Sequence, residues 1–366
     1  MSIIIFLIIL AILVLVHEFG HFIVAKKSGI RVDEFGLGFP PKIIGKKWGG
    51  TLYTLNAIPF GGFVKIFGED AHAENISEED KKNSFVFKSK WIQSAVLVAG
   101  VTMNMIFAWL VLSLGFFIGL PSPTDYSGFG QVKDVKLVIT EVLKDSPAQK
   151  AGIIAGDTIV FAGSGKTSLQ DENLNPQKVK DLISDQKNKN IEILIKRGES
   201  INKTFILEPT IDEVSGKRLL GIGMDSVGTL KLPAHLALLE GARTTWLVTK
   251  GTVVGTLGFL YDAITFQSDL SQVAGPVGIA SVVGEARTLG FVYLLSIVAL
   301  ISINLAVINL LPIPALDGGR LLFVAIEGIT GRTIKPSIVM WTNTIGFAFL
   351  LILMAVVTTH DIFKLF

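Results

Sequence analysis

Hydrophobic residues gather in four long segments, and polar residues fill the stretches between them. The apolar segments cover residues 3–25, 92–120, 291–311 and 338–358. A transmembrane helix needs about 20 mostly apolar residues to cross the hydrocarbon core of a bilayer. The pattern therefore predicts a polytopic α-helical membrane protein with four transmembrane helices.

Charged residues beside these segments predict their orientation. No Lys or Arg precedes the first segment, whereas Lys26 and Lys27 follow it, which is the reverse of the charge order in a signal peptide. The segment is therefore expected to remain as a span. Because Lys and Arg favour the cytoplasmic side, residues 26–90 and 320–336 are expected inside and residues 121–290 outside. Both chain termini then face outward.

Residues 232–266 are apolar enough to suggest a fifth span. Four charged side chains interrupt the stretch: Glu240, Arg243, Lys250 and Asp262. An unpaired charge is costly at bilayer depth, so we expect an amphipathic helix on the membrane surface, within a helix-and-loop segment at residues 229–290. A fifth crossing here would reverse the direction of every later span.

The outer segment begins with a region of alternating polarity. Short β-prone runs surround one helical stretch at residues 176–184; the runs are residues 136–142, 158–161, 191–195 and 204–207. This pattern predicts an α/β module at residues 121–228. The chain then divides into residues 1–120 with the first two spans, the module at 121–228, the segment at 229–290, and residues 291–366 with the last two spans.

One stretch of the module resembles the PDZ pattern, in which a short helix leads into a Gly-Asp turn before a strand. The pattern lies in residues 146–148, 151–153 and 155–157. A PDZ groove would bind an extended peptide by strand addition, and residues 221–224 are a candidate for its carboxylate-binding loop. The alternative is a general α/β domain in which Gly-Asp is only a turn.

Composition narrows the possible chemistry. Of 366 residues, 17% are charged and 50% are hydrophobic, whereas a soluble chain carries about 25% charged residues. The chain has no cysteine, so disulfides and thiolate sites are excluded and any metal site must use nitrogen and oxygen ligands. A net charge of +2 without a basic stripe gives no indication of a nucleic-acid partner.

The end of the first span contains the sequence His17-Glu18-Phe19-Gly20-His21. Residues four apart share one face of a helix, so both imidazoles can reach one ion. Glu18 can then reach a water bound to that ion, which is the zinc-protease HExxH arrangement. The alternative is a polar cluster at a helix end among lipid headgroups. Such a cluster is costly at membrane depth unless it is paired or bound to metal.

A catalytic zinc site needs a third protein ligand, and the end of the third span offers one. Pro312 and Pro314 break the helix there, Gly318 and Gly319 permit conformations closed to other residues, and Asp317 lies between them. With four crossings, the first and third spans run in the same direction and bring His17, His21 and Asp317 to the cytoplasmic side. The alternative is a helix end with an exposed Asp in a turn.

Together these motifs resemble the site-2 protease family of intramembrane zinc metalloproteases, in particular its bacterial envelope-stress regulators. The resemblance rests on HExxH in the first span and on NxxPxPxLDG at residues 309–318. Further segments extend it over nearly the whole chain: residues 35–68, Gly100 with Asn104, the PDZ-like module and residues 275–278. The envelope-stress regulators carry two tandem PDZ domains, whereas this chain has room for one.

The resemblance implies a site and a substrate. His17, His21 and Asp317 would hold Zn²⁺, and Glu18 would act as the catalytic base. Residues 35–68, rich in Gly and Pro, would form a membrane-associated β-hairpin that holds the substrate as an added strand. Gly61, Gly62 and Asn309 are candidate substrate-binding residues. An ordinary cytoplasmic hairpin is the alternative for the first two, and Asn309 could instead satisfy carbonyls freed by the prolines.

The resulting hypothesis is an intramembrane zinc endopeptidase of a bacterial inner membrane, acting in regulated intramembrane proteolysis. Its partners would be single-span membrane proteins, such as anti-sigma factor fragments or signal-peptide remnants, together with the lipid bilayer and a ligand of the PDZ-like module. The alternatives are a non-catalytic PDZ-bearing scaffold for envelope proteins and a metal transporter. Asn104 is expected to be an interhelical polar contact rather than a ligand.

Overall fold

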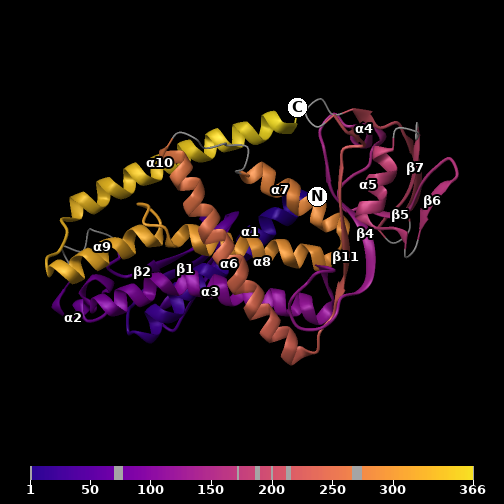
Figure 1. Cartoon of the computed structure of the whole chain (residues 1–366). Coiled ribbons are helices and arrows are strands. Elements are labelled where there is room, and N and C mark those ends of the chain that lie inside the picture. Colours follow the sequence, from indigo (N-terminus) through magenta and orange to yellow (C-terminus); the bar gives the residue numbers. More distant parts are fainter. Residues whose placement is uncertain are drawn as a thin grey trace. The chain divides into compact units, whose positions relative to one another are not determined.

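The computed structural model describes residues 2–69, 77–170, 173–185, 190–198, 201–211, 216–265 and 274–365. These residues form two compact units, and Figure 1 shows their helices and strands. The first unit contains residues 1–112, 241–287 and 295–366, and the second contains residues 113–240 and 288–294. Each unit has a hydrophobic core of its own.

Four helices of the described chain are long and apolar enough to cross a membrane, in agreement with the four predicted segments. They are α1 (Ser2–Lys27), α3 (Lys90–Ile118), α8 (Phe291–Leu310) and α10 (Pro336–Leu365). Helices α3 and α8 share a buried core of small and branched side chains: Ala108, Val111, Leu112, Ala299, Ile303 and Val307. Small residues allow membrane helices to approach closely.

A long β-hairpin follows α1, as the composition of residues 35–68 and the family resemblance predicted. Strand β1 (Val32–Trp48) pairs antiparallel with β2 (Thr51–Ile66). Its register shows that the hairpin folds back on itself, because residues 34–37 lie opposite both residues 52–55 and residues 62–65. Within the described chain, the last stretch of β2 pairs on one side only, so it forms an edge of the sheet.

A side-chain hydrogen bond holds this hairpin beside the last turns of α1. The Lys26 ammonium donates to the carbonyl of Gly49 in the hairpin turn over 2.8 Å. The short helix α2 (Glu78–Lys81) and the 3-10 turn η2 (Phe85–Phe87) then lead to α3. Phe85 N–H donates to the carbonyl of Phe67 over 2.9 Å, which ties this segment to the end of the hairpin.

Helix α6 (Ala234–Ile264) covers most of the stretch expected on the membrane surface, and it is not among the candidate spans of the described chain, so its place at the membrane stays a prediction. The Thr249 hydroxyl lies 3.8 Å from the sulfur of Met105 on α3. Thr252 donates to Oδ1 of Asn304 on α8 over 3.3 Å. The middle of α6 therefore lies alongside two candidate spans. Thr245 is buried and Thr249 is half-buried, and both also donate to carbonyls of their own helix.

Helix α7 (Pro276–Leu289) occupies the rest of the segment predicted as helix and loop at residues 229–290, of which residues 266–273 lie outside the described chain. The buried carboxylate of Asp361 accepts a hydrogen bond from the N–H of Gly278 over 2.7 Å. A side chain on Gly278 would meet that carboxylate at 3.2 Å. The small residues at the start of α7 thus make room for a polar contact with α10.

The connection between the last two spans contains a helix, α9 (Asp317–Thr330), that the sequence pattern did not predict. Gly318 and Gly319 lie inside this helix, where a side chain on Gly319 would meet the backbone carbon of Ile313 at 2.8 Å. The expectation that these glycines adopt unusual conformations is therefore wrong. They allow close packing instead, and the positive φ of 74° occurs at Ala315.

The second unit is an α/β module with a seven-stranded sheet. The strands pair in the order β3-β11-β4-β5-β7-β8, and β6 pairs with β5. Their bounds are β3 (Leu120–Pro123), β4 (Lys133–Val142), β5 (Thr158–Ser164), β6 (Thr167–Gln170), β7 (Ile191–Arg197), β8 (Ile201–Leu207) and β11 (Ile222–Leu230). A separate pair consists of β9 (Thr210–Ile211) and β10 (Arg218–Leu219).

Two helices accompany this sheet: α4 (Pro147–Ala151) and α5 (Pro176–Ser184). The predicted β-prone runs fall within β4, β5, β7 and β8, and α5 has the predicted bounds. Alternate residues of β7 are buried, as a two-residue period requires. Helix α5 packs its apolar face into the same core.

The stretch with the PDZ pattern forms the predicted short helix and turn. The Ser146 hydroxyl caps α4 by accepting from the N–H of Gln149 over 3.2 Å, and Gly152 ends the helix with a φ of 84°. Asp157, which is fully buried before β5, forms an ion pair of 2.6 Å with Arg197. The local pattern is thus set by a cap, a glycine and a buried charge pair.

Candidate metal centre

The HExxH residues occupy the last turns of α1. Their helical spacing brings the rings of His17 and His21 to a centroid distance of 4.8 Å, and both side chains are buried. The two Nε2 atoms lie 3.2 Å apart. Two nitrogen lone pairs can therefore point at one position, as the spacing predicted.

Asp317 at the start of α9 completes a three-atom cluster. Its Oδ2 lies 2.9 Å from Nε2 of His17 and 3.3 Å from Nε2 of His21. In a tetrahedral zinc site with bonds of about 2.0–2.1 Å, ligand atoms lie roughly 3.3 Å apart. The distances and the donor set of two imidazoles and one carboxylate fit such an ion. The same Oδ2 is buried and has no hydrogen-bond partner in the described chain.

Asp317 lies outside the four candidate spans, and its surroundings set its charge. Burial raises the pKa of its carboxyl, but the two imidazoles beside it outweigh that effect and hold the pKa well below its usual range. Asp317 is therefore ionised at neutral pH. With two neutral imidazoles, this carboxylate would leave a divalent ion with a net positive charge, which would favour deprotonation of a bound water.

A close crossing of α1 and α3 makes room for the two rings. A side chain on Gly20 would meet the backbone carbon of Ala99 at 2.7 Å. A side chain on Gly100 would lie 2.7 Å from Cε1 of both His17 and His21. The absence of side chains at these two positions lets α3 pass directly behind the imidazoles.

Helix α3 also contacts the ring nitrogens that face away from the cluster. Nδ1 of His21 lies 2.7 Å from the carbonyl oxygen of Val96. Nδ1 of His17 lies 3.3 Å from Nδ2 of Asn104, a fully buried residue. The Val96 contact is not predictable from the sequence, because a backbone carbonyl belongs to no motif. Asn104, predicted to make an interhelical polar contact, joins α3 to His17 of α1.

Glu18 is positioned by the hairpin. Its Oε2 accepts a hydrogen bond from the backbone N–H of Val64 over 3.2 Å. Val64 belongs to the edge stretch of β2, so the carboxylate lies between the metal-ligand cluster and the sheet edge. This contact is not predictable from HExxH, because the partner is a backbone group 46 residues away.

The three predicted substrate-binding residues lie in different surroundings. Gly61 and Gly62 are buried, and a side chain on Gly61 would contact Val14 of α1 at 3.4 Å. Asn309 lies in the last turn of α8 and is half-buried. Its side chain makes no hydrogen bond to the described residues. The roles of all three stay predictions.

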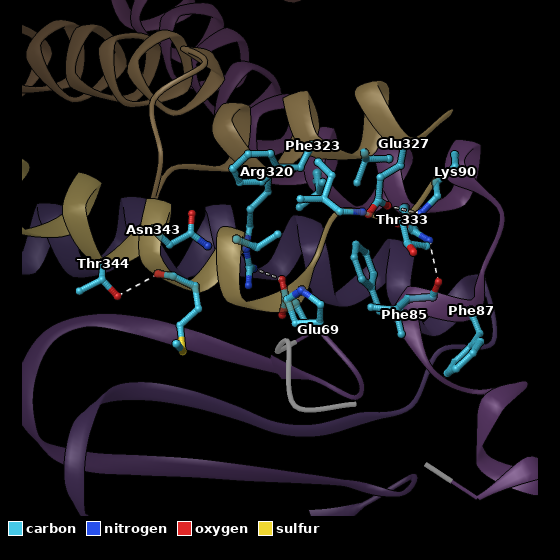
Figure 2. A pocket seen from close by; sticks show the side chains of 18 residues that line it. Glu69, Phe85, Phe87, Lys90, Arg320, Phe323, Glu327, Thr333, Asn343 and Thr344 are labelled. Carbon is cyan, nitrogen blue, oxygen red and sulfur yellow. Dashed lines mark hydrogen bonds and ion pairs between the residues drawn. The ribbon is translucent and has the colours of Figure 1, made fainter. Parts of the chain in front are cut away.

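A cavity of about 740 Å³ lies along α9, but none of the candidate metal ligands lines it (Figure 2). Two ion pairs border it. Arg320 pairs with Glu69, which follows the hairpin, and Lys90 at the start of α3 lies 2.5 Å from Glu327. Glu327 also accepts from the N–H of Ile334 over 2.8 Å. These contacts fix both ends of α9 and thereby the position of its first residue, Asp317.

Comparison with known families agrees with this geometry. Residues 5–353 match Peptidase family M50. The match covers almost the whole chain, from the first span to the last, and includes the HExxH segment and Asp317. The chain therefore belongs to peptidase family M50, the site-2 protease family.

Named relatives extend over nearly their full lengths. A protein of Clostridium perfringens, whose name describes it as a candidate zinc metalloprotease, is 37% identical over 351 residues, covering 96% of this chain and 95% of the relative. A similarly named protein of Clostridium acetobutylicum is 33% identical, with coverages of 99% and 97%. The regulator of sigma-W protease RasP of Bacillus subtilis is 30% identical, with coverages of 100% and 99%.

Proposed function

We propose that the chain is an intramembrane zinc endopeptidase that cuts single-span membrane proteins within regulated proteolysis. The observation that carries the proposal is the convergence of Nε2 of His17, Nε2 of His21 and Oδ2 of Asp317. Both histidines lie on α1, which is long and apolar enough to cross a membrane, and Asp317 follows α8, another such helix. Zn²⁺ is the expected cofactor of this donor set, and relatives are named for zinc.

In this proposal His17, His21 and Asp317 hold the ion and leave one position open. Zinc would supply Lewis-acid polarisation of a peptide carbonyl and acidify a water molecule. Glu18 takes the proton of the attacking water and delivers it to the amine of the cleaved bond. The Val64 N–H orients the Glu18 carboxylate for this transfer, as its 3.2 Å hydrogen bond supports.

A membrane helix hides its peptide bonds in its own hydrogen-bond ladder, so a substrate must be extended before it is cut. The edge stretch of β2 is suited to hold an extended segment, because strand addition needs an unpaired strand edge. Its contact with Glu18 through Val64 puts that edge beside the proposed base. Asn309 would hydrogen-bond the extended backbone.

We further propose a location in a bacterial inner membrane, with both termini outside and the metal site toward the cytoplasm. Lys26 and Lys27 at the end of α1 support this orientation. The PDZ-like module would then lie outside and bind a peptide between β11 and α5, with residues 221–224 as its carboxylate-binding loop. Trimmed anti-sigma factors and signal-peptide remnants are the proposed substrates.

The test uses purified full-length protein reconstituted with a panel of single-span substrates. Glu18→Gln is expected to lower cleavage by about 100-fold or more while zinc stays bound, because only the base is lost. Glu192→Gln is the matched control, since Glu192 is exposed on β7. A chelator should abolish cleavage by the wild type. Equal cleavage by wild type and Glu18→Gln would remove Glu18 as the base.

The same experiment separates the protease from its rivals. A scaffold would bind substrates without cutting them, and Glu18→Gln would change nothing. A metal transporter would move zinc into vesicles without proteolysis. Against transport, the candidate ligands lie together at one end of α1 and after α8, whereas a transport path needs polar residues spread across the membrane.

A further inference from the structure

One helix contacts both imidazoles of the metal-ligand cluster at their Nδ1 atoms. Nδ1 of His21 faces the carbonyl of Val96 at 2.7 Å, and Nδ1 of His17 faces the side-chain amide of Asn104 at 3.3 Å. Both partners belong to α3. The opposite nitrogens, both Nε2, face Asp317. Each ring therefore has one nitrogen for the metal and one nitrogen for α3.

These contacts determine which tautomer each ring can adopt. A neutral imidazole carries one N–H, and the metal needs the unprotonated nitrogen. A carbonyl oxygen only accepts hydrogen bonds, so Val96 favours the proton on Nδ1 of His21 and leaves Nε2 free. His17 needs an acceptor at the same position for the same result.

Asn104 can provide this acceptor. Its amide has a donor end and an acceptor end, which exchange places when the amide turns by half a rotation. With Nδ2 facing His17, the Oδ1 of Asn104 is buried without a hydrogen-bond partner in the described chain. Half a turn places Oδ1 against Nδ1 of His17, where it can accept the proton that the metal-binding tautomer carries.

We propose that Asn104 is a positioning residue of the metal centre: its side-chain oxygen accepts the Nδ1–H of His17 and so presents Nε2 to the ion. It would favour the proton on Nδ1 of His17, as the Val96 carbonyl favours the proton on Nδ1 of His21. This inference rests on the proposed function of the cluster. Partners of this kind fix ring orientation and tautomer in metal sites.

The position of Asn104 is fixed independently of its side chain. Ser302 of α8 donates from its hydroxyl to the backbone carbonyl of Asn104 over 2.8 Å, and both residues are fully buried. Contact between α3 and α8 at this point therefore uses the Asn104 backbone, whereas its side chain contacts His17 of α1. A role in packing α3 against α8 alone would not require that direction.

The test measures zinc affinity of the full chain by competition with a chromogenic chelator. Asn104→Leu keeps the approximate size but removes the acceptor, and zinc affinity is expected to fall about 10- to 100-fold. Asn104→Asp keeps an acceptor oxygen and should retain or raise the affinity. Ser302→Ala is the matched control, because it removes the interhelical hydrogen bond alone and should leave zinc affinity unchanged.

Each result bears on the proposal. Unchanged affinity in Asn104→Leu would overturn it, and so would an equal loss in Asn104→Leu and Asn104→Asp. If Asn104→Leu fails to fold, Asn104→Asp decides, since a lower affinity than wild type contradicts an acceptor role. The proposed function fails separately, when the wild type itself neither binds zinc nor cleaves substrates.

Discussion

Two histidines at helical spacing and one aspartate 296 positions beyond the second meet within 3.3 Å of one another. The histidine pair follows from the geometry of one helix, because residues four apart share a face. The aspartate follows from no local rule. Its place depends on α9, whose two ends are held by the ion pairs of Arg320 and Glu327.

Removal of the Asp317 carboxylate should therefore affect zinc binding itself, unlike loss of Glu18, which should leave zinc bound. We expect Asp317→Ala to lose zinc and cleavage together, because two imidazoles alone do not make the three-ligand site of zinc enzymes. Metal content by atomic absorption and a substrate assay check this. Asp262→Ala is the control, since Asp262 is exposed on α6. Full metal content in Asp317→Ala would exclude Asp317 as a ligand.

At the scale of elements, the crossing of α1 and α3 decides whether the site can form. Gly20 and Gly100 let the two backbones approach, and Gly100 lies against both histidine rings. The sequence showed HExxH and Gly100 but not that they touch. Which helices cross at which residues depends on packing between distant segments, and no periodicity within one segment encodes it.

A methyl group at this crossing should disturb the site. Gly100→Ala is expected to lower zinc affinity and to reduce stability by about 1–3 kcal/mol, because its Cβ would overlap the histidine rings and force the helices apart. Zinc competition and thermal unfolding measure the two effects. Gly251→Ala on α6 is the control, since open space surrounds that position. Equal behaviour of the two variants would contradict the close crossing.

Helix α6 has contacts at this scale that composition does not predict. Its charges predicted a helix on the membrane surface, which stays a prediction, and Thr249 and Thr252 contact α3 and α8. Hydroxyl groups can also bond their own helix, so threonines fit at such helix contacts. The sequence pattern also did not predict helix α9, because the two prolines and two glycines around its start are typical of a turn.

At the scale of the whole molecule, the decisive feature is the number of crossings. In the proposed topology, an even number of crossings between α1 and the end of α8 would bring the histidines and Asp317 to one side of the membrane, and these three residues do lie together.

The orientation can be tested with single cysteines, because the natural chain has none. Lys166→Cys lies at an exposed turn of the module, and Arg332→Cys lies in the exposed connection after α9. We expect a membrane-impermeant maleimide to label the first site in intact spheroplasts and the second only after the membrane is opened. The reverse order of labelling would contradict the positive-inside assignment.

The sequence by itself determined the four apolar spans, the hairpin, the elements of the module and the HExxH pair. Each depends on a local period, on glycine and proline positions or on residue spacing, which a linear pattern carries. Tertiary structure alone decided that Asp317 meets the histidines, that α3 contacts both Nδ1 atoms, that Val64 meets Glu18 and that α6 packs along the spans. These contacts join segments far apart in the chain, and several use backbone groups, which are the same at every residue.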